Sequence, residues 1–367
     1  MACDPLSLVS DNIRSLQPYR PGKPIEELER ELGITDIVKL ASNENPLGPG
    51  PMAREAIARQ VGDLSRYPDG NGFLLKHKIA SHLSITPEML TLGNGSNDVL
   101  ELVARVFASP KHEIIFSQYA FAVYPLVTQA IGAQGIKTRA IDFGHDLSAM
   151  IEAITGRARV IFIANPNNPT GTWVNAALLD AFLRAVPDTV LVVVDEAYRE
   201  YMDHPDYPDC VAWLSRYPNL IVTRTFSKAH GLAALRVGYA VSHPDIADLL
   251  NRVRQPFNVN SMALAAAAAA LEDSDHLRRT KHLNDAGYRQ LTAAFDELGL
   301  EHIPSAGNFI AVDVGQEGEE MYHRLLKQGV IARPVGNYAL PNHLRVSIGL
   351  EEENERFILA LKHSVKY

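Results

Sequence analysis

The stretch Thr225-Phe226-Ser227-Lys228-Ala229-His230-Gly231 directly follows a short apolar run at residues 220–223. A continuous apolar run bounded by turn residues is typical of a strand that is buried on both faces of a parallel sheet. A lysine at the exit of such a strand, among small and hydroxylated residues, is shielded from solvent. Burial lowers the pKa of an amine and makes it a better nucleophile. Lys228 is therefore a candidate for covalent chemistry; the plain alternative is a lysine that only caps a strand.

Similar apolar runs occur on both sides of this stretch, at residues 112–116, 159–164, 190–194 and 236–241. Amphipathic segments with helical spacing lie among them, for example residues 97–107 and 175–184. This alternation predicts an α/β fold, with a large domain whose mainly parallel sheet is covered by helices. Ligands of such folds bind near the carboxyl ends of the strands.

The chain has 367 residues, which favours two domains over one. Its first forty residues are polar and contain Pro18, Pro21 and Pro24. Near Pro256 the pattern changes to a long helical stretch at 261–298, followed by short strands and helices. We expect an N-terminal arm (1–40) that joins the small domain, a large cofactor-binding domain (41–255) and a smaller α/β C-terminal domain (256–367).

Composition excludes several classes of function. The formal net charge of −8 argues against a nucleic-acid binder, which would carry a basic stripe. Cys3 and Cys210 are the two cysteines, too few and too far apart for a disulfide framework or a zinc site, so we expect no metal and a reducing, cytoplasmic setting. No signal-peptide pattern is evident, and the alanine-rich run at 263–271 is too short to span a membrane.

Asp195-Glu196-Ala197-Tyr198 closes the apolar run at 190–194. An ionised carboxylate at the end of a buried strand needs a charged or hydrogen-bonded partner. A protonated pyridine nitrogen would be one such partner, and the pairing would keep the ring cationic as an electron sink. The Asp-Glu pair could equally be the N-cap of a helix, so this motif alone leaves both interpretations open.

Two turns complete the pattern. Gly93-Asn94-Gly95-Ser96-Asn97 opens a helical segment, and such a turn offers free N–H groups and a helix dipole to a phosphate. Asn165-Pro166-Asn167-Asn168-Pro169-Thr170-Gly171 follows the run at 159–164 and combines stiff prolines with side-chain amides. Each turn could also be purely structural.

Taken together, these four motifs resemble the fold-type-I aminotransferases that depend on pyridoxal 5′-phosphate, and the resemblance covers nearly the whole chain. It implies that Lys228 holds the cofactor as a Schiff base. It also implies that Asp195 pairs with the ring nitrogen, and that Tyr198 and Asn168 contact the 3′-oxygen. The phosphate cup then consists of Gly95, Ser96, Asn97, Thr225, Ser227 and Arg236. The aromatic residue that stacks on the ring falls within 118–125, where Phe121 is favoured; many relatives carry tyrosine there, with a proline where this chain has Tyr119.

Further motifs resemble the histidinol-phosphate aminotransferases. They are Asn43-Glu44-Asn45-Pro46-Leu47-Gly48, Arg66-Tyr67-Pro68-Asp69-Gly70, Ile331-Ala332-Arg333-Pro334 and Leu344-Arg345-Val346-Ser347-Ile348-Gly349. This resemblance implies transfer of the amino group of L-histidinol phosphate to 2-oxoglutarate, giving imidazole acetol phosphate and glutamate. It implies a homodimer with shared active sites, in which Tyr67 reaches the cofactor phosphate of the neighbouring subunit. The implied substrate residues are Tyr19, Asn43, Tyr67, Arg333 and Arg345.

Other interpretations stay open at this point. An aromatic amino acid aminotransferase or a phosphothreonine-type decarboxylase would use the same scaffold. A catalytically inactive binding module is a more distant alternative, and the intact Lys228 and the lack of an appended DNA-binding domain count against it. Arg333 and Arg345 could form surface salt bridges instead of binding substrate. We interpret His230, beside the lysine, as a residue for packing or orientation.

Overall fold

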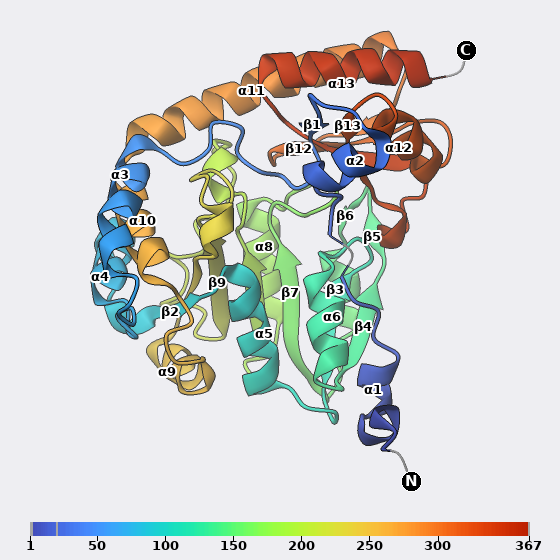
Figure 1. Ribbon diagram of the computed structural model, residues 1–367. Coiled ribbons are helices and arrows are strands. Elements are labelled where there is room, and N and C mark those ends of the chain that lie inside the picture. Colours follow the sequence, from blue (N-terminus) through green and yellow to red (C-terminus); the bar gives the residue numbers. More distant parts are fainter. Residues whose placement is uncertain (1–2, 20, 366–367) are drawn as a thin grey trace.

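A seven-stranded sheet forms the centre of the large domain in this computed structural model, which describes residues 3–19 and 21–365 (Figure 1). The strand order is β2-β10-β9-β8-β7-β3-β4. The bounds are β2 Leu90–Gly93, β3 Glu113–Ser117, β4 Gln134–Thr138, β7 Ala158–Ala164, β8 Leu191–Asp195, β9 Leu220–Thr225 and β10 Gly238–Ser242. Strands β4, β3, β7, β8 and β9 are parallel, whereas β10 is antiparallel to both of its neighbours. The predicted mainly parallel sheet is confirmed, and each predicted strand lies within two residues of its expected place.

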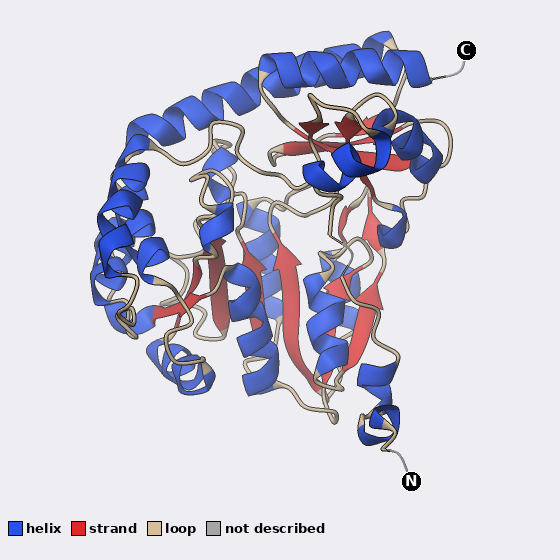
Figure 2. Ribbon diagram, viewed as in Figure 1, coloured by secondary structure: helices blue, strands red, loops and turns tan. Residues whose placement is uncertain are grey.

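Helices cover both faces of this sheet, as Figure 2 shows. One face packs against α5 (Ser96–Phe107), α6 (Val123–Ala130) and α9 (Pro244–Val253). The opposite face packs against α7 (Leu147–Glu152), α8 (Ala176–Ala185) and a group made of α3 (Pro51–Gln60), α4 (Phe73–Leu83) and α10 (Ser261–Ala270). Because strands buried on both faces need apolar side chains at every position, the sequence of these strands reads as continuous apolar runs.

The predicted long helical stretch at 261–298 is helical but is divided into two helices, α10 and α11 (Ser274–Glu297). Asp273 is the N-cap of α11 and accepts a hydrogen bond of 3.1 Å from the backbone N–H of His276, which stabilises a new helix start. Five alanines of α10 are buried in the large-domain core, whereas Leu291 and Phe295 of α11 belong to the small-domain core. The expected domain boundary near residue 256 stays a prediction.

The small domain is built on an antiparallel sheet in the order β11-β12-β15-β14. Its strands are β11 His302–Ile303, β12 Phe309–Asp313, β14 Arg333–Pro334 and β15 His343–Ser347. α11, α12 (Gly318–Leu326) and α13 (Glu351–Ser364) pack against it, with α11 and α13 lying side by side along one edge of the molecule (Figure 1). Short elements complete the chain: β5 Ala140–Ile141, β6 Gly144–His145, η1 Pro5–Leu8, η2 Val61–Asp63, η3 Pro87–Met89, η4 Arg199–Tyr201, η5 Ala233–Leu235 and η6 Gly336–Tyr338.

The N-terminal arm contacts both domains. Near its start, α1 (Asp11–Arg14) lies against α6, where the Asn12 amide donates hydrogen bonds to the carbonyls of Gln129 and Ala130. Farther along, α2 (Ile25–Leu32) buries Leu28 against Leu326 in the small domain. β1 (Val38–Lys39) then pairs in parallel with β13 (Val330–Ile331). Among the described helices, none is both long and apolar enough to cross a membrane.

Candidate active site

A cavity of about 350 Å³ lies at the carboxyl ends of β7, β8 and β9, where the small domain and the arm meet the large domain. Of the residues predicted for the site, all except Gly95 and Tyr67 line it. These lining residues are Tyr19, Asn43, Ser96, Asn97, Phe121, Asn168, Asp195, Tyr198, Thr225, Ser227, Lys228, Arg236, Arg333 and Arg345. The structure thus gathers residues that are more than 300 positions apart in sequence at one place.

Lys228 extends from the turn after β9 into this cavity. Its Nζ donates a hydrogen bond of 3.2 Å to the carbonyl of Ser42 and lies 5.9 Å from the centre of the Tyr198 ring. Burial, followed by the positive charge of Arg345, lowers the pKa of the Lys228 amine from 10.5 to about 8. The neutral, nucleophilic form of this amine is therefore available near neutral pH.

Asp195 is the last residue of β8, and its buried carboxylate is held on both oxygens. Tyr124 Oη donates to Oδ2 over 2.9 Å and Thr223 Oγ1 donates to Oδ1 over 3.1 Å. Burial raises the pKa of Asp195, and these two hydrogen bonds oppose the rise. Neither donor was predicted from the sequence. Thr223 could have been found, because aligning the two neighbouring strands places it opposite Asp195; Tyr124 carries no comparable signal.

The two carboxylates of the Asp-Glu motif lie on opposite faces of the sheet. Glu196 points away from the cavity and forms a buried ion pair of 2.8 Å with Arg224. Neither carboxylate caps the following helical turn η4, whose N-cap is Tyr198. The alternative of a helix N-cap is therefore wrong for this motif.

Tyr198 with Asn43, and Asn168 with Arg345, form two hydrogen-bonded polar pairs that line the cavity. Asn43 Nδ2 donates to Tyr198 Oη over 2.9 Å, and Arg345 Nη1 donates to Asn168 Oδ1 over 2.6 Å. Burial raises the pKa of Tyr198 to about 12. Arg345 is buried, so the alternative of a surface salt bridge is wrong for this residue.

In the turn after β7, only one of the three asparagines is available to a ligand. Asn165 exchanges two hydrogen bonds with the backbone of Val174, and Asn167 donates to the carbonyl of Tyr119. These two residues hold the turn in place. Asn168 lines the cavity. The turn therefore offers this one side chain to a ligand, while the other two asparagines stabilise the turn.

The N-terminus of α5 forms an anion cradle with Arg236. Gly95 has φ +79°, and a Cβ at this position would lie 2.4 Å from Arg236 Nη2, so only glycine allows the guanidinium to approach the turn. Arg236 Nη1 also donates to Ser227 Oγ over 3.3 Å, and the Ser227 N–H donates to Thr225 Oγ1 over 3.1 Å. A helix N-terminus, a guanidinium and hydroxyl groups together suit a phosphate.

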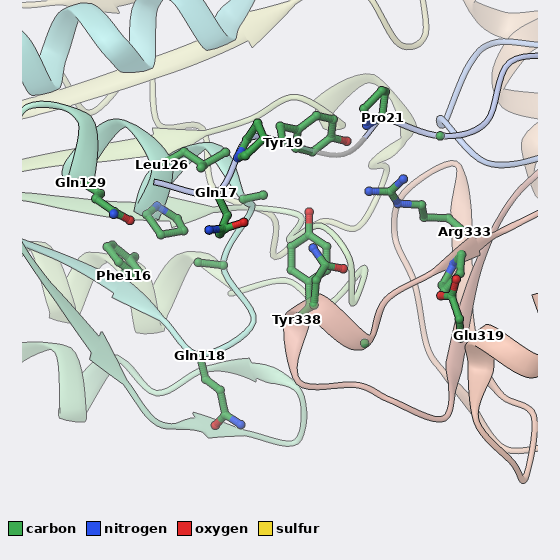
Figure 3. A pocket seen from close by; sticks show the side chains of 18 of the residues that line it. Gln17, Tyr19, Pro21, Phe116, Gln118, Leu126, Gln129, Glu319, Arg333 and Tyr338 are labelled. Carbon is green, nitrogen blue, oxygen red and sulfur yellow. The ribbon is translucent and has the colours of Figure 1, made fainter. Parts of the chain in front are cut away.

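A second cavity of about 630 Å³ adjoins the first and shares Tyr19, Gly22 and Arg333 with it. Figure 3 shows Tyr19 from the arm, Arg333 from β14 and Tyr338 from η6 converging on its interior. The Arg333 guanidinium carbon lies 5.7 Å from the centre of the Tyr19 ring. This second cavity offers aromatic walls, and its Arg333 is a cation that it shares with the lysine-bearing cavity.

Tyr67 lies outside both cavities. Its side chain is 83% exposed, and its ring stacks on Phe257 with 4.8 Å between centroids. His230 is also outside the cavities: it is buried against Phe226, with Nε2 4.0 Å from Glu200 Oε1. Within the described part of the chain, no group of three or more histidine, cysteine or acidic side chains is placed to hold a metal ion.

The model of a family described as aminotransferase class I and II matches residues 35–361. Histidinol-phosphate aminotransferase 1 of Nitrosococcus oceani is 59% identical over 355 residues, which cover 97% of this chain and 96% of that protein. Histidinol-phosphate aminotransferase 2 of Pseudomonas aeruginosa is 58% identical over 360 residues, which cover 98% of each chain. This chain belongs to the histidinol-phosphate aminotransferase family. The family that the motifs of the sequence predicted is thus confirmed.

A solved structure agrees with this assignment. The crystal structure of histidinol-phosphate aminotransferase from Sinorhizobium meliloti in complex with pyridoxal 5′-phosphate matches with a TM-score of 0.89 and 30% identity, covering 98% of each chain. The chain is therefore an aminotransferase of fold type I, and its cofactor is pyridoxal 5′-phosphate, as predicted.

The residues around the first cavity fit this cofactor. The Gly95 cradle, which a Cβ would fill, leaves room for the Arg236 guanidinium beside a phosphate. Asp195 is a buried carboxylate that lines the cavity and has no cationic partner among the described hydrogen bonds and ion pairs, so a protonated ring nitrogen would balance its charge. Lys228 supplies an amine of lowered pKa to the same cavity.

Proposed function

We propose that this aminotransferase moves the amino group of L-histidinol phosphate to 2-oxoglutarate, giving imidazole acetol phosphate and glutamate in histidine biosynthesis. The observation that carries the proposal is the placement of buried Arg345 in the same cavity as Lys228. The donor has no α-carboxylate but carries a phosphate ester, so its affinity depends on a cation near the reacting carbon. A cytoplasmic location stays a prediction.

When bound, pyridoxal phosphate supplies an aldehyde that condenses with amines and a cationic ring that accepts the electron pair released at the substrate Cα. Lys228 anchors it covalently in the resting enzyme. The Nζ of Lys228 would also be the base that takes the proton from the substrate Cα and returns it at C4′ of the cofactor. The lowered pKa supports this role, because a base that is neutral near the working pH can accept a proton and then return it.

Four other side chains are proposed to hold the ring in place. Asp195 keeps the ring nitrogen protonated through its carboxylate at the end of β8. Tyr198 and Asn168 line the cavity and would contact the 3′-oxygen of the cofactor. Tyr198 is itself held by Asn43 over 2.9 Å, so Asn43 fixes the direction of the phenol. Phe121, which precedes α6 and lines the cavity, would stack on the ring.

The acidic group of either substrate is proposed to bind at Arg345, with Arg333 and Tyr19 beside it. A planar guanidinium can form two parallel hydrogen bonds with a phosphate or with a carboxylate. One site can therefore accept both the phosphate ester and the dicarboxylate. The adjoining cavity, lined by Tyr19 and Tyr338, is large enough for the imidazole ring of the donor.

The active form is proposed to be a homodimer with shared sites. Tyr67 is exposed, and other exposed apolar side chains lie near it in sequence or, for Phe257, stack on its ring. An isolated subunit would leave these side chains in water. These are Leu47, Met52, Val61, Leu64, Phe73, Leu74 and Phe257. A second copy that covers this surface would receive the Tyr67 hydroxyl near the cofactor phosphate of its own site.

Steady-state kinetics test the substrate assignment. We expect kcat/KM for histidinol phosphate to exceed that for phenylalanine and tyrosine, both measured with 2-oxoglutarate. Aromatic amino acids are the second candidate donors, because the tyrosine-lined cavity also suits a phenyl or phenol ring, and we expect weaker but measurable turnover of them. A higher kcat/KM for phenylalanine or tyrosine would make the enzyme mainly an aromatic aminotransferase.

A further inference from the structure

Tyr124 is a fully buried residue of α6 that connects this helix to the carboxylate of Asp195. Its ring stacks on Phe162 of β7, with 4.7 Å between centroids and an interplanar angle of 9°, and it meets the Phe121 ring edge-on at 5.9 Å. This packing leaves the phenol little freedom. Its Oη donates a hydrogen bond of 2.9 Å to Asp195 Oδ2.

Thr223 holds the other oxygen of the same carboxylate. It lies on β9 directly opposite Asp195 on β8, and its Oγ1 donates to Oδ1 over 3.1 Å. Both donors are buried, and neither lines the cavity. They approach the carboxylate from within the protein, whereas Asp195 itself lines the cavity. The lone pairs of the Asp195 carboxylate that do not accept these two hydrogen bonds are therefore available to a ligand in the cavity.

We propose that Tyr124, together with Thr223, is a positioning residue that keeps Asp195 ionised and directed at the ring nitrogen of pyridoxal phosphate. This inference rests on the proposed role of Asp195. Neither residue touches the cofactor, and both act through the carboxylate. Tyr124 is thus a further determinant of the electron-accepting strength of the cofactor ring.

The physical reason is the position of one proton. In a buried pair of carboxylate and pyridinium, the proton can stay on the nitrogen or move to the carboxylate, which leaves two neutral partners. Hydrogen-bond donors to the carboxylate stabilise its charged form and so favour the proton on nitrogen. Burial alone acts in the opposite direction, because it raises the pKa of Asp195. Removing the Tyr124 hydroxyl should therefore move the proton toward Asp195 and weaken the electron sink.

Tyr124→Phe tests this proposal, because it removes the hydroxyl and keeps the ring that stacks on Phe162. The holoenzyme is loaded with pyridoxal phosphate labelled with ¹⁵N in the ring, and the ¹⁵N chemical shift is measured by NMR. We expect the shift to move from the pyridinium value toward the neutral pyridine value. We also expect kcat to fall about 10- to 100-fold with little change in KM, which is the loss that one hydrogen bond to a charged group corresponds to.

Two variants complete the design. Tyr217→Phe is the matched control, since Tyr217 Oη donates to the Asp180 carboxylate over 2.8 Å and lines neither active-site cavity; its ¹⁵N shift and kcat should equal those of the wild type. Thr223→Val removes the second donor at nearly constant volume and should move the ¹⁵N shift in the same direction as Tyr124→Phe. It also keeps the proposal testable should Tyr124→Phe fail to fold.

Asp195→Asn separates this inference from the role on which it depends. A large change in the ¹⁵N shift for Asp195→Asn, with wild-type shifts for both Tyr124→Phe and Thr223→Val, would overturn the role of Tyr124 alone. An unchanged shift for Asp195→Asn would instead overturn the pairing of Asp195 with the ring nitrogen.

Discussion

Arg345 and Asn168 are joined by a hydrogen bond of 2.6 Å from Nη1 to Oδ1. Arg345 lies on β15 of the small domain and Asn168 follows β7 of the large domain, so the bond crosses the cavity between the two domains. Nη2 of the same guanidinium donates to the carbonyl of Ala41 over 2.6 Å. Both terminal nitrogens of Arg345 are therefore held by hydrogen bonds before any substrate binds.

Replacement of Arg345 should weaken both substrates. For Arg345→Ala we expect a loss of about 2–5 kcal/mol in apparent binding of histidinol phosphate and of 2-oxoglutarate, the order typical of a buried charge-assisted contact. Arg345→Lys should also be poor, because an ammonium cannot reproduce the planar fork. The measurement is kcat/KM for each substrate. Arg356→Lys, which affects a small-domain surface pair with Asp36, is the control and should behave like the wild type.

Removal of the proposed anchor should abolish turnover. Lys228→Ala loses both the covalent link to the cofactor and the group that carries the proton, so we expect less than roughly 1% of wild-type activity without added amine. Peptide mapping after borohydride reduction of the wild type should find the cofactor on Lys228. Lys78→Ala, which removes a surface ion pair with Glu272, should leave activity intact. Higher residual activity of Lys228→Ala would contradict the assignment.

Recombination of the cofactor-free protein with pyridoxal phosphate should depend on pH through Lys228. Only the neutral amine attacks an aldehyde, and a lowered pKa means that this form appears at lower pH. The recombination rate should therefore rise with pH until a midpoint near the pKa of Lys228, which is about 8 rather than 10.5, and become level above it. Absorbance of the bound cofactor, followed after rapid mixing, gives the rate. In Arg345→Ala the midpoint should move upward, because a neighbouring positive charge has been removed.

Mixed dimers test whether Tyr67 acts in the neighbouring site. Tyr67→Phe and Lys228→Ala subunits, each poorly active alone, should regain activity after subunit exchange, because one site of each hybrid contains an intact Lys228 and receives an intact Tyr67. An equal mixture should reach about one quarter of wild-type activity, since half of the dimers are hybrid and each has one complete site.

Arg345→Ala mixed with Lys228→Ala is the matched control for this exchange. Arg345 and Lys228 of one subunit line the same cavity, so every site in the hybrid lacks one of the two and no recovery is expected. No recovery with Tyr67→Phe after confirmed exchange would show that Tyr67 is not shared in the proposed way. Recovery in the control would instead show that Arg345 and Lys228 of one subunit do not serve the same site.

The sequence predicted the candidate site residues best where they lie at the ends of strands. Lys228, Asp195 and Asn168 each follow a continuous apolar run, and the parallel sheet brings these ends together at one edge. The division between α10 and α11 was not predicted, because helical spacing continues through the alanine-rich segment and only the Asp273 cap marks the new start. Tyr124 was missed for a different reason: its contact with Asp195 joins positions 71 residues apart through tertiary packing.

Asp195 and Glu196 are consecutive residues whose side chains lie on opposite faces of the sheet. We therefore expect the two positions to tolerate different substitutions among relatives. Glu196 is balanced by Arg224 within the protein. Removing one partner of such a buried pair costs about 3–5 kcal/mol, whereas exchanging both for apolar residues of similar volume is often neutral. Positions 196 and 224 can therefore change together across relatives. Among the described residues, Asp195 has hydrogen-bond donors but no cationic partner in its ion pairs and hydrogen bonds, and its proposed counter-charge belongs to the cofactor. If that proposal holds, this acid should stay invariant in every active relative while its neighbour covaries.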